Sequence, residues 1–186
     1  MWHIKKDTVE RWCWCQPLTK EGCDKIIEIG KKLDLKPMAE PDTDAAKDRK
    51  GKYAVIPITD DTRWIFETCS KMVIDMNTQF FEYDLHYISE LHFMAYEKVG
   101  DVYNKHIDVM YDSAGIRKLS FSIQLSDPET YKGAELLIHF EKDPTKAKRD
   151  QGAMTLYPSF SLNETTPLVK GVSYVLVGWV VGPKLK

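Results

Sequence analysis

The sequence has no long hydrophobic run, few cysteines and no excess of charge of one sign. No stretch approaches the roughly 18 apolar residues of a membrane-spanning helix, and the N-terminal MWHIKKDTVERWCWC lacks the apolar core of a signal peptide. The chain carries 26 basic and 28 acidic residues spread along its length, which argues against nucleic acid or an anionic membrane as a partner. We therefore expect a soluble, cytoplasmic or otherwise intracellular protein.

The four cysteines are too few and too unevenly spaced to define a metal site or a disulfide framework. They are Cys13, Cys15, Cys23 and Cys69, and these intervals match no zinc-binding pattern. We expect buried free thiols, as in a reducing compartment. The one basic run, residues 142–149, also contains an acidic residue and a proline, so we expect a solvated loop there.

The first part of the sequence predicts two amphipathic helices. At 186 residues the chain is long enough to bury a core, and we expect one domain spanning residues 1–186. Apolar residues recur at helical spacing over residues 19–33, although Gly30 weakens the last turn. A helix-start signal around Asp60 precedes a second apolar series that ends near Phe81.

The stretch between the helices differs from the strand-like region that follows. Residues 36–52 are polar and punctuated by prolines, so we expect a mobile loop and a candidate lid. From about residue 90 the apolar period changes to two, as in RKLSFSIQL. We expect an α+β, mainly β fold: a double-stranded β-helix, or jelly roll, over residues 85–186, with helical support from residues 1–84 packed on one sheet.

Two residues in the strand region have the spacing of metal ligands. His106 and Asp108 lie two apart, so on an extended segment both side chains leave the same face. An imidazole and a carboxylate are two of the three ligands in a 2-His-1-carboxylate site, which leaves open positions on non-haem Fe(II). The pair indicates a candidate metal-binding and catalytic site that lacks one ligand.

The C-terminal half carries a series of motifs around this pair: Tyr96 ten residues before His106, then RKLS, QLSD, YKGAEL, LYPSFSLNETTPLVKG and SYVLVGW. In this order they resemble the Fe(II)- and 2-oxoglutarate-dependent oxygenases of the prolyl 4-hydroxylase type. The resemblance implies a double-stranded β-helix, Fe(II) and 2-oxoglutarate as cofactors, and hydroxylation of a peptide or small-molecule substrate. It also implies that Tyr96, Gln124 and Trp179 line the co-substrate pocket.

Two positions depart from the family pattern. Asn163 stands where the family has its second iron-binding histidine, and Ser173 stands where a basic residue grips the distal carboxylate of 2-oxoglutarate. By resemblance the metal ligands are His106, Asp108 and Asn163, but an amide is a poorer donor for Fe(II) than imidazole. Losing an imidazole ligand should weaken metal binding by at least about 10- to 100-fold. A carboxylate without its cation costs about 3 kcal/mol.

Other polar residues are candidates for replacing the missing groups. His92 shares strand parity with Tyr96, which is expected to point inward, whereas His139 has the parity of the outer face. Lys118 shares the face of the pocket residues and has the charge to neutralise a carboxylate. Lys170 is expected in a solvated turn.

Three functions therefore remain open. The first is an oxygenase that couples 2-oxoglutarate decarboxylation to hydroxylation. The second is a catalytically degenerate oxygenase fold that serves as a binding or structural module, as the substitutions at Asn163 and Ser173 suggest. The third keeps His106 and Asp108 for another metal or an altered co-substrate.

Overall fold

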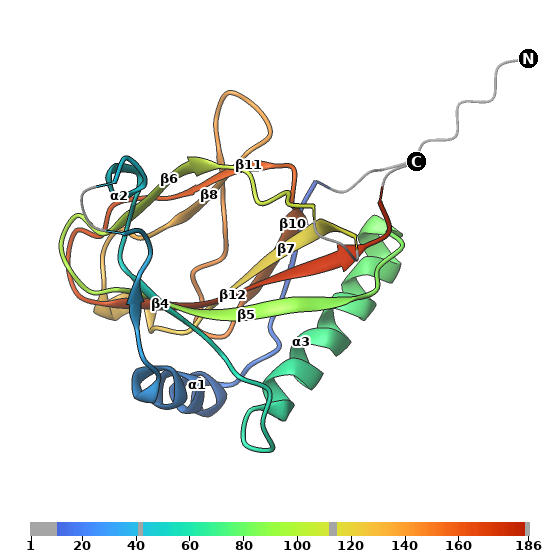
Figure 1. Cartoon of the computed structure of the whole chain (residues 1–186), viewed down its shortest axis with the longest axis horizontal. Helices are drawn as coiled ribbons and strands as arrows, with labels where there is room; N and C mark the ends of the chain where they lie inside the picture. Colours follow the sequence, from blue (N-terminus) through green and yellow to red (C-terminus); the bar gives the residue numbers. More distant parts are fainter. Residues whose placement is uncertain (1–10, 41–42, 112–114, 185–186) are drawn as a thin grey trace, which may run out of the picture.

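Two antiparallel sheets form the centre of the molecule (Figure 1). The computed structural model describes residues 11–40, 43–111 and 115–184. The 7 strands of the larger sheet are, in spatial order, β1 (Cys13–Cys15), β10 (Met154–Pro158), β7 (Ile116–Gln124), β12 (Ser173–Gly182), β5 (Tyr87–Tyr96), β4 (Lys52–Val55) and β2 (Lys36–Pro37). The 5 strands of the smaller sheet are β3 (Arg49–Lys50), β6 (Val102–His106), β11 (Leu162–Thr165), β8 (Leu136–His139) and β9 (Thr145–Lys146). This arrangement confirms the predicted double-stranded β-helix.

Two long helices cover the outer face of the larger sheet (Figure 1). They are α1 (Lys20–Lys32) and α3 (Arg63–Met76), and α3 continues as a π-helical turn, η1 (Asn77–Phe81). Thr19 caps α1, because its side-chain oxygen accepts a hydrogen bond from the Gly22 backbone N–H. A short 3-10 helix, η2 (Pro128–Thr130), follows β7. The positions predicted for both long helices are confirmed.

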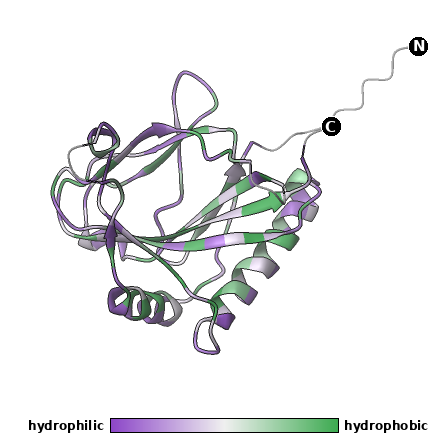
Figure 2. Ribbon diagram, in the orientation of Figure 1, coloured by the Kyte–Doolittle hydropathy of each residue, from purple (hydrophilic) through white to green (hydrophobic). Residues whose placement is uncertain are grey.

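The main core lies between these helices and the larger sheet. Hydrophobic residues recur along α3 and on the strands beneath it (Figure 2). On β7 and just beyond it, Leu119, Phe121, Ile123 and Leu125 are each 0% exposed and belong to this core. The apolar alternation of this segment therefore faces the helices, as period two predicts, and leaves Ser120, Ser122 and Gln124 for the space between the sheets.

Gly30 has a packing role in this core. A Cβ atom built on Gly30 would lie 2.4 Å from the ring of Phe93, closer than two carbon atoms can approach. The glycine that weakens the last turn of α1 is therefore what allows the helix to lie flat against β5.

The prediction for residues 36–52 was wrong in part. Instead of forming a loop throughout, this segment contains β2, the short helix α2 (Ala45–Asp48), β3 and the start of β4. β2 extends the larger sheet by pairing with β4, and β3 joins the smaller sheet by pairing with β6. Two-residue strands show no apolar period, so composition alone does not reveal them. Positions 41–42 lie outside the described residues. The first 84 residues are thus more than a helical support.

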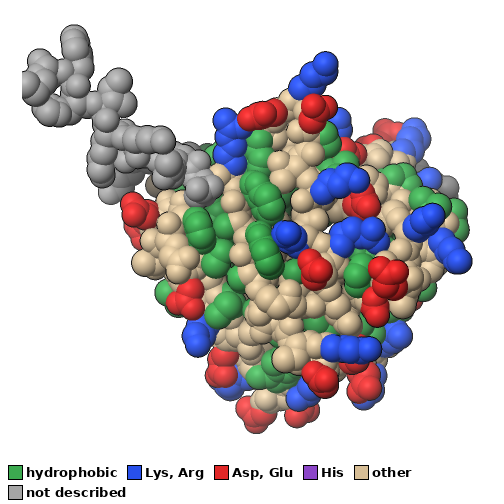
Figure 3. All heavy atoms as spheres, turned by 180° about the vertical axis from the view of Figure 1, so that it is seen from behind, with side chains coloured by type: hydrophobic (Ala, Val, Ile, Leu, Met, Phe, Trp, Pro, Cys, Tyr) green, Lys and Arg blue, Asp and Glu red, His purple; other side chains and the backbone are tan. Residues whose placement is uncertain are grey.

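The surface and the thiols agree with the composition. Acidic and basic side chains are interspersed over the face in Figure 3. None of the four cysteines is in a disulfide; Cys13, Cys23 and Cys69 are buried, as predicted, whereas Cys15 is only half-buried. In the described ranges no helix is both long enough and apolar enough to cross a membrane.

Candidate metal and co-substrate site

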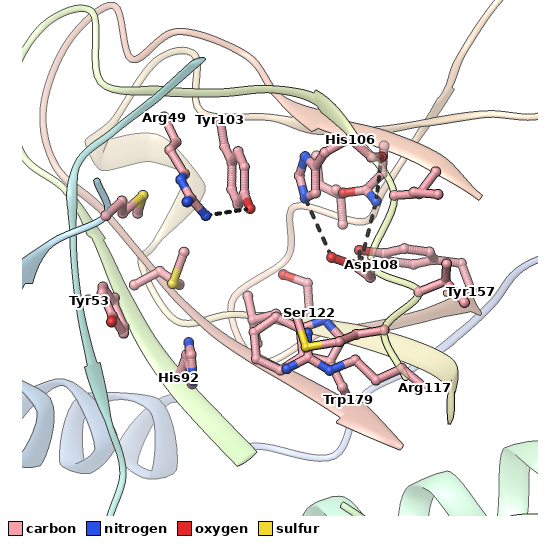
Figure 4. Close-up of a pocket in the computed structure, with 18 of the residues that line it drawn as sticks. Arg49, Tyr53, His92, Tyr103, His106, Asp108, Arg117, Ser122, Tyr157 and Trp179 are labelled. Atoms are coloured by element: carbon pink, nitrogen blue, oxygen red, sulfur yellow. Dashed lines mark hydrogen bonds and ion pairs between the residues drawn. The ribbon is translucent and has the colours of Figure 1, made fainter. Parts of the chain in front are cut away.

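A cavity of about 480 Å³ opens between the two sheets (Figure 4). Its volume lies within the roughly 300 to 1,000 Å³ that is usual for small-ligand pockets. Its wall includes six of the residues singled out from the sequence: His92, Tyr96, His106, Asp108, Asn163 and Trp179. Strands from both sheets contribute to this wall, so the sandwich itself holds the candidate site.

The His106 ring is held at the end of β6 with one nitrogen toward Asp108. Its Nδ1 lies 2.8 Å from the carbonyl oxygen of Asn104, and the ring stacks on Tyr103 with a centroid distance of 3.7 Å. Because only a protonated Nδ1 can donate to that carbonyl, the neutral ring has its lone pair on Nε2. Nε2 lies 3.5 Å from Asp108 Oδ1 (Figure 4). The two atoms can share a proton or bind one metal cation.

The Asp108 carboxylate is buried but remains charged. It is 9% exposed, and the Tyr157 hydroxyl donates to its Oδ2 at 3.3 Å. Burial alone would raise the pKa of Asp108, but the protonated form of His106, which carries a charge and can donate from Nε2, lowers it below its ordinary value with help from Ser120. A carboxylate that stays ionised is what a metal ligand requires.

Asn163 faces the same two residues but presents its nitrogen. It pairs directly with His106 across β11 and β6. Its Nδ2 lies 3.3 Å from the carbonyl oxygens of His106 and Ser161 and 3.4 Å from Asp108 Oδ2. A flipped amide would set its oxygen against these acceptors, so they select the orientation in which Asn163 donates.

The donor set therefore fits a metal in two positions and not in the third. His106 and Asp108 converge on one point, whereas Asn163 supports the Asp108 carboxylate. In the part of the chain that the structure describes, no three His, Cys, Asp or Glu side chains are grouped closely enough to hold a metal ion.

The other residues expected near the co-substrate lie at different depths. Tyr96 is 2% exposed, and its hydroxyl donates to Thr165 Oγ1 at 3.4 Å. Gln124 lines a separate cavity of about 20 Å³ behind the main one. Ser173 is fully buried, with its Oγ 3.5 Å from Gln124 Nε2. Gln124 and Ser173 thus lie deeper in the barrel than His106 and Asp108.

The candidate replacements for the missing groups occupy other places. His92 lines the main cavity, as its parity predicts, but its Nε2 lies 2.7 Å from Glu90 Oε2. Burial lowers the pKa of His92. His139 pairs instead with Glu164 at 2.8 Å, on the outer face. Within the described ranges, Lys118 and Lys170 are not in the wall of the main cavity.

Two arginines in the cavity wall were missed by the sequence reasoning. The register of β7 on β12 shifts between Leu119 and Arg117, so Lys118 is an extra residue in a β-bulge. The bulge turns Arg117 into the cavity, where its guanidinium lies 4.1 Å from the Trp179 ring. Arg49, from β3, donates to the Tyr103 hydroxyl on the other side of the cavity (Figure 4). An alternating apolar pattern does not reveal a β-bulge, so the inward direction of Arg117 was not expected. Arg49 was not expected in the cavity wall because it lies in the segment predicted to be a loop.

Fold and site together define a double-stranded β-helix whose central cavity holds an imidazole and a carboxylate 3.5 Å apart. No family model matches the sequence. Over 81 residues the chain is 40% identical to a PKHD-type hydroxylase of Prochlorococcus marinus, and over 82 residues it is 40% identical to one of a Synechococcus species. Each match covers 44% of this chain and 37% of the relative, so the chain spans little more than a third of the length of these relatives.

Solved structures of prolyl hydroxylases share the fold over nearly the whole chain. A Pseudomonas putida prolyl-4-hydroxylase matches with a TM-score of 0.72 at 16% identity, covering 92% of each chain. A Trichoplax adhaerens prolyl hydroxylase, solved with a hypoxia inducible factor peptide, matches with a TM-score of 0.75 at 14% identity, covering 95% of this chain and 85% of that one. The chain thus shares its fold with prolyl hydroxylases and, over less than half of its length, its sequence with PKHD-type hydroxylases.

Proposed function

We propose that the chain is a 2-oxoglutarate- and Fe(II)-dependent hydroxylase whose metal is held by two protein side chains, His106 and Asp108. The observation that carries this proposal is the 3.5 Å separation of His106 Nε2 and Asp108 Oδ1 in the wall of a cavity of about 480 Å³. When bound, Fe(II) supplies the chemistry by which O2 converts 2-oxoglutarate to succinate and CO2 and places one oxygen atom in a substrate C–H bond.

The residues around the pair would keep both ligands in position. Asn104 fixes the tautomer of His106 through Nδ1, and Tyr157 and Asn163 each donate to Asp108 Oδ2. Hydrogen bonds of this kind orient metal ligands, and their loss typically costs about 10- to 100-fold in affinity or activity. Such support is expected to matter more where one protein ligand is missing.

A peptide substrate fits the cavity opening. Ile107 and Met110 line the cavity and are 52% and 55% exposed, so they add apolar surface beside the opening. Exposed apolar surface at the edge of a cavity is typical of a protein or peptide contact. The Trichoplax relative, solved with a peptide, has the same fold.

Metal content and succinate release test the hydroxylase proposal. Purified protein given Fe(II), ascorbate and 2-oxoglutarate should bind iron and release succinate above a metal-free control. His106→Ala should abolish both. His139→Ala is the matched control, because His139 pairs with Glu164 on the outer face and should leave both unchanged. A wild-type protein that neither retains iron nor releases succinate would contradict the proposal.

The second candidate function is a binding or structural module on a degenerate oxygenase fold. Two observations favour it: Asn163 donates to Asp108, and the fully buried Ser173 has no charge. The double substitution Asn163→His and Ser173→Arg separates the two candidates. If it starts succinate release in a protein that otherwise shows none, the natural chain has lost catalysis at these two positions.

A further inference from the structure

The small cavity behind the candidate metal site contains an arginine from outside the barrel strands. Its wall shares Ser122 and Leu136 with the main cavity, and Gln124, Tyr131 and Arg149 also line it. Arg149 belongs to the basic run that the sequence predicted to be a solvated loop. In the structure its side chain lines this small cavity and remains 37% exposed.

Arg149 is held weakly and has a donor to spare. Its Nη1 lies 3.4 Å from Glu135 Oε1, and its Nη2 lies 3.3 Å and 3.4 Å from the carbonyl oxygens of Pro128 and Tyr131. These contacts are longer than the usual N–H···O distance of about 2.9 to 3.0 Å. Arg149 Nε is buried and has no hydrogen-bond partner within the described ranges. Buried donors normally have an acceptor, so this one has room for another.

Tyr131 connects Arg149 to the position where the family's basic residue is missing. The guanidinium carbon lies 4.9 Å from the centre of the Tyr131 ring, and Tyr131 is 5% exposed. Burial raises the pKa of Tyr131, while hydrogen bonding with Arg149 and with Ser173 opposes that rise. The phenol therefore interacts with both the cation and Ser173.

Glu135 does not cancel the positive charge of Arg149 by itself. Glu135 also pairs with Lys146 at 3.1 Å, so one carboxylate serves two cations. Glu129 adds a more distant negative charge near Arg149.

We propose that Arg149, together with Tyr131 and Ser173, binds the distal carboxylate of the co-substrate. A carboxylate taken out of water needs a cation, and Ser173 supplies none. Arg149 reaches the cavity of Gln124 beside Ser173, whereas Arg117 lies at Trp179 near the opening. The inference rests on the proposed function, because only a 2-oxo acid held at the metal site would direct its distal carboxylate toward Arg149.

The carboxylate needs space that Gln124 now fills. A cavity of about 20 Å³ holds little more than one water molecule. The three contacts of Gln124 Nε2, to Ser126, Ser173 and Tyr174, are all 3.4 to 3.5 Å long. Such weak contacts allow the amide to turn aside, which would join the two cavities.

Calorimetric binding of two related acids tests the assignment. 2-Oxoglutarate carries the distal carboxylate, whereas 2-oxopentanoate has a methyl group in its place. With Mn(II) replacing Fe(II), so that no turnover occurs, the wild type should prefer 2-oxoglutarate. Arg149→Met should reduce 2-oxoglutarate affinity by about 10- to 100-fold and leave 2-oxopentanoate unchanged. Lys142→Met, which removes an exposed cation from the same loop, should change neither.

Two further variants make the result decisive. Arg149→Lys should retain part of the preference, and Glu135→Gln should strengthen 2-oxoglutarate binding by removing the competing carboxylate. If Arg149→Met does not fold, the Glu135→Gln variant tests the inference alone. Weaker or unchanged 2-oxoglutarate binding by Glu135→Gln would then overturn it. Unchanged preference in Arg149→Met, with loss in Arg117→Met, assigns the anchor to Arg117 instead. A wild type that binds neither acid contradicts the proposed function itself.

Discussion

Asn163 Nδ2 lies 3.4 Å from Asp108 Oδ2, so the residue in the position expected for a third metal ligand donates a hydrogen bond to the second. The pairing of Asn163 with His106 across β11 and β6 puts the amide beside His106 and Asp108. The Asn163 side chain therefore makes a contact between protein groups at this position. Under the proposed function, the side chain at position 163 determines whether two or three protein groups can hold the metal.

Asn163→His is expected to raise the affinity for divalent metal by at least about 10-fold, because it restores an imidazole beside His106 and Asp108. Isothermal titration with Co(II) measures the change. Asn163→Ala removes the same hydrogen bond without adding a ligand and should give no gain. The gain should also disappear in the double variant with His106→Ala, and its persistence there would show that the new histidine binds metal elsewhere.

Gly30→Ala is expected to destabilise the fold by about 1 to 3 kcal/mol. The new methyl group would lie 2.4 Å from the Phe93 ring, and this overpacking outweighs the gain in helix propensity. The control is Gly22→Ala in the same helix, where the nearest atom would be 3.6 Å away. It should stabilise by up to about 1 kcal/mol. Urea unfolding of both variants gives the comparison, and equal effects would refute the packing role of Gly30.

Lys52→Met is expected to reduce stability in a pH-dependent way. Lys52 Nζ lies 2.9 Å from Glu97 Oε2 and lowers the pKa of Glu97. A carboxyl group with a lowered pKa in the folded state stabilises above its unfolded pKa of about 4.3, and the contribution disappears as the pH falls through the folded value. The wild type should be slightly more stable to unfolding than the variant near neutral pH, and the difference should be small because solvent screens a partly exposed pair.

Urea unfolding at about pH 7 and about pH 3 measures this difference at both ends of the window. The control is Lys50→Met, because Lys50 is exposed. The difference in unfolding free energy between this variant and the wild type should be the same at both pH values. A difference that grows as the pH falls would contradict the assigned direction.

The thiols should differ in reactivity within the folded protein. Burial raises the pKa of Cys23 to about 11 and that of Cys69 to about 12. The thiolate is the reactive form, so both should resist iodoacetamide at about pH 8. Cys15 is half-buried and should be alkylated first. Peptide mass spectrometry before and after unfolding in urea checks the order, and early labelling of Cys69 would show that the core between α3 and β1 opens readily.

The helices and strands in which apolar residues recur at regular spacing could be predicted from the sequence. The places where this spacing is interrupted could not. The alternation of Leu119, Phe121 and Ile123 placed β7 and both of its faces correctly. The first residues of β7 could not be predicted. The bulge at Lys118 moves the Arg117 side chain to the face opposite the one that strict alternation gives.

The candidate site shows the same limit. His106 and Asp108 share a cavity wall, as their spacing predicts. Arg149 was missed because it reaches the barrel through a loop whose composition is that of solvated surface, and a tertiary contact of this kind leaves no trace in local sequence. The direction of the Asn163 amide likewise depends on acceptors from β6 and from the turn before β11.

The segment 36–52 has a mechanical consequence. Lys36 is paired with Tyr53 in one sheet and Arg49 with Tyr103 in the other, so one short stretch of backbone tethers both layers beside the cavity. The layers cannot separate there unless one of these pairings breaks. A ligand that binds Arg49 would therefore stabilise both of these strand pairings. The backbone amides of β4 and β6 would then exchange with solvent together rather than independently.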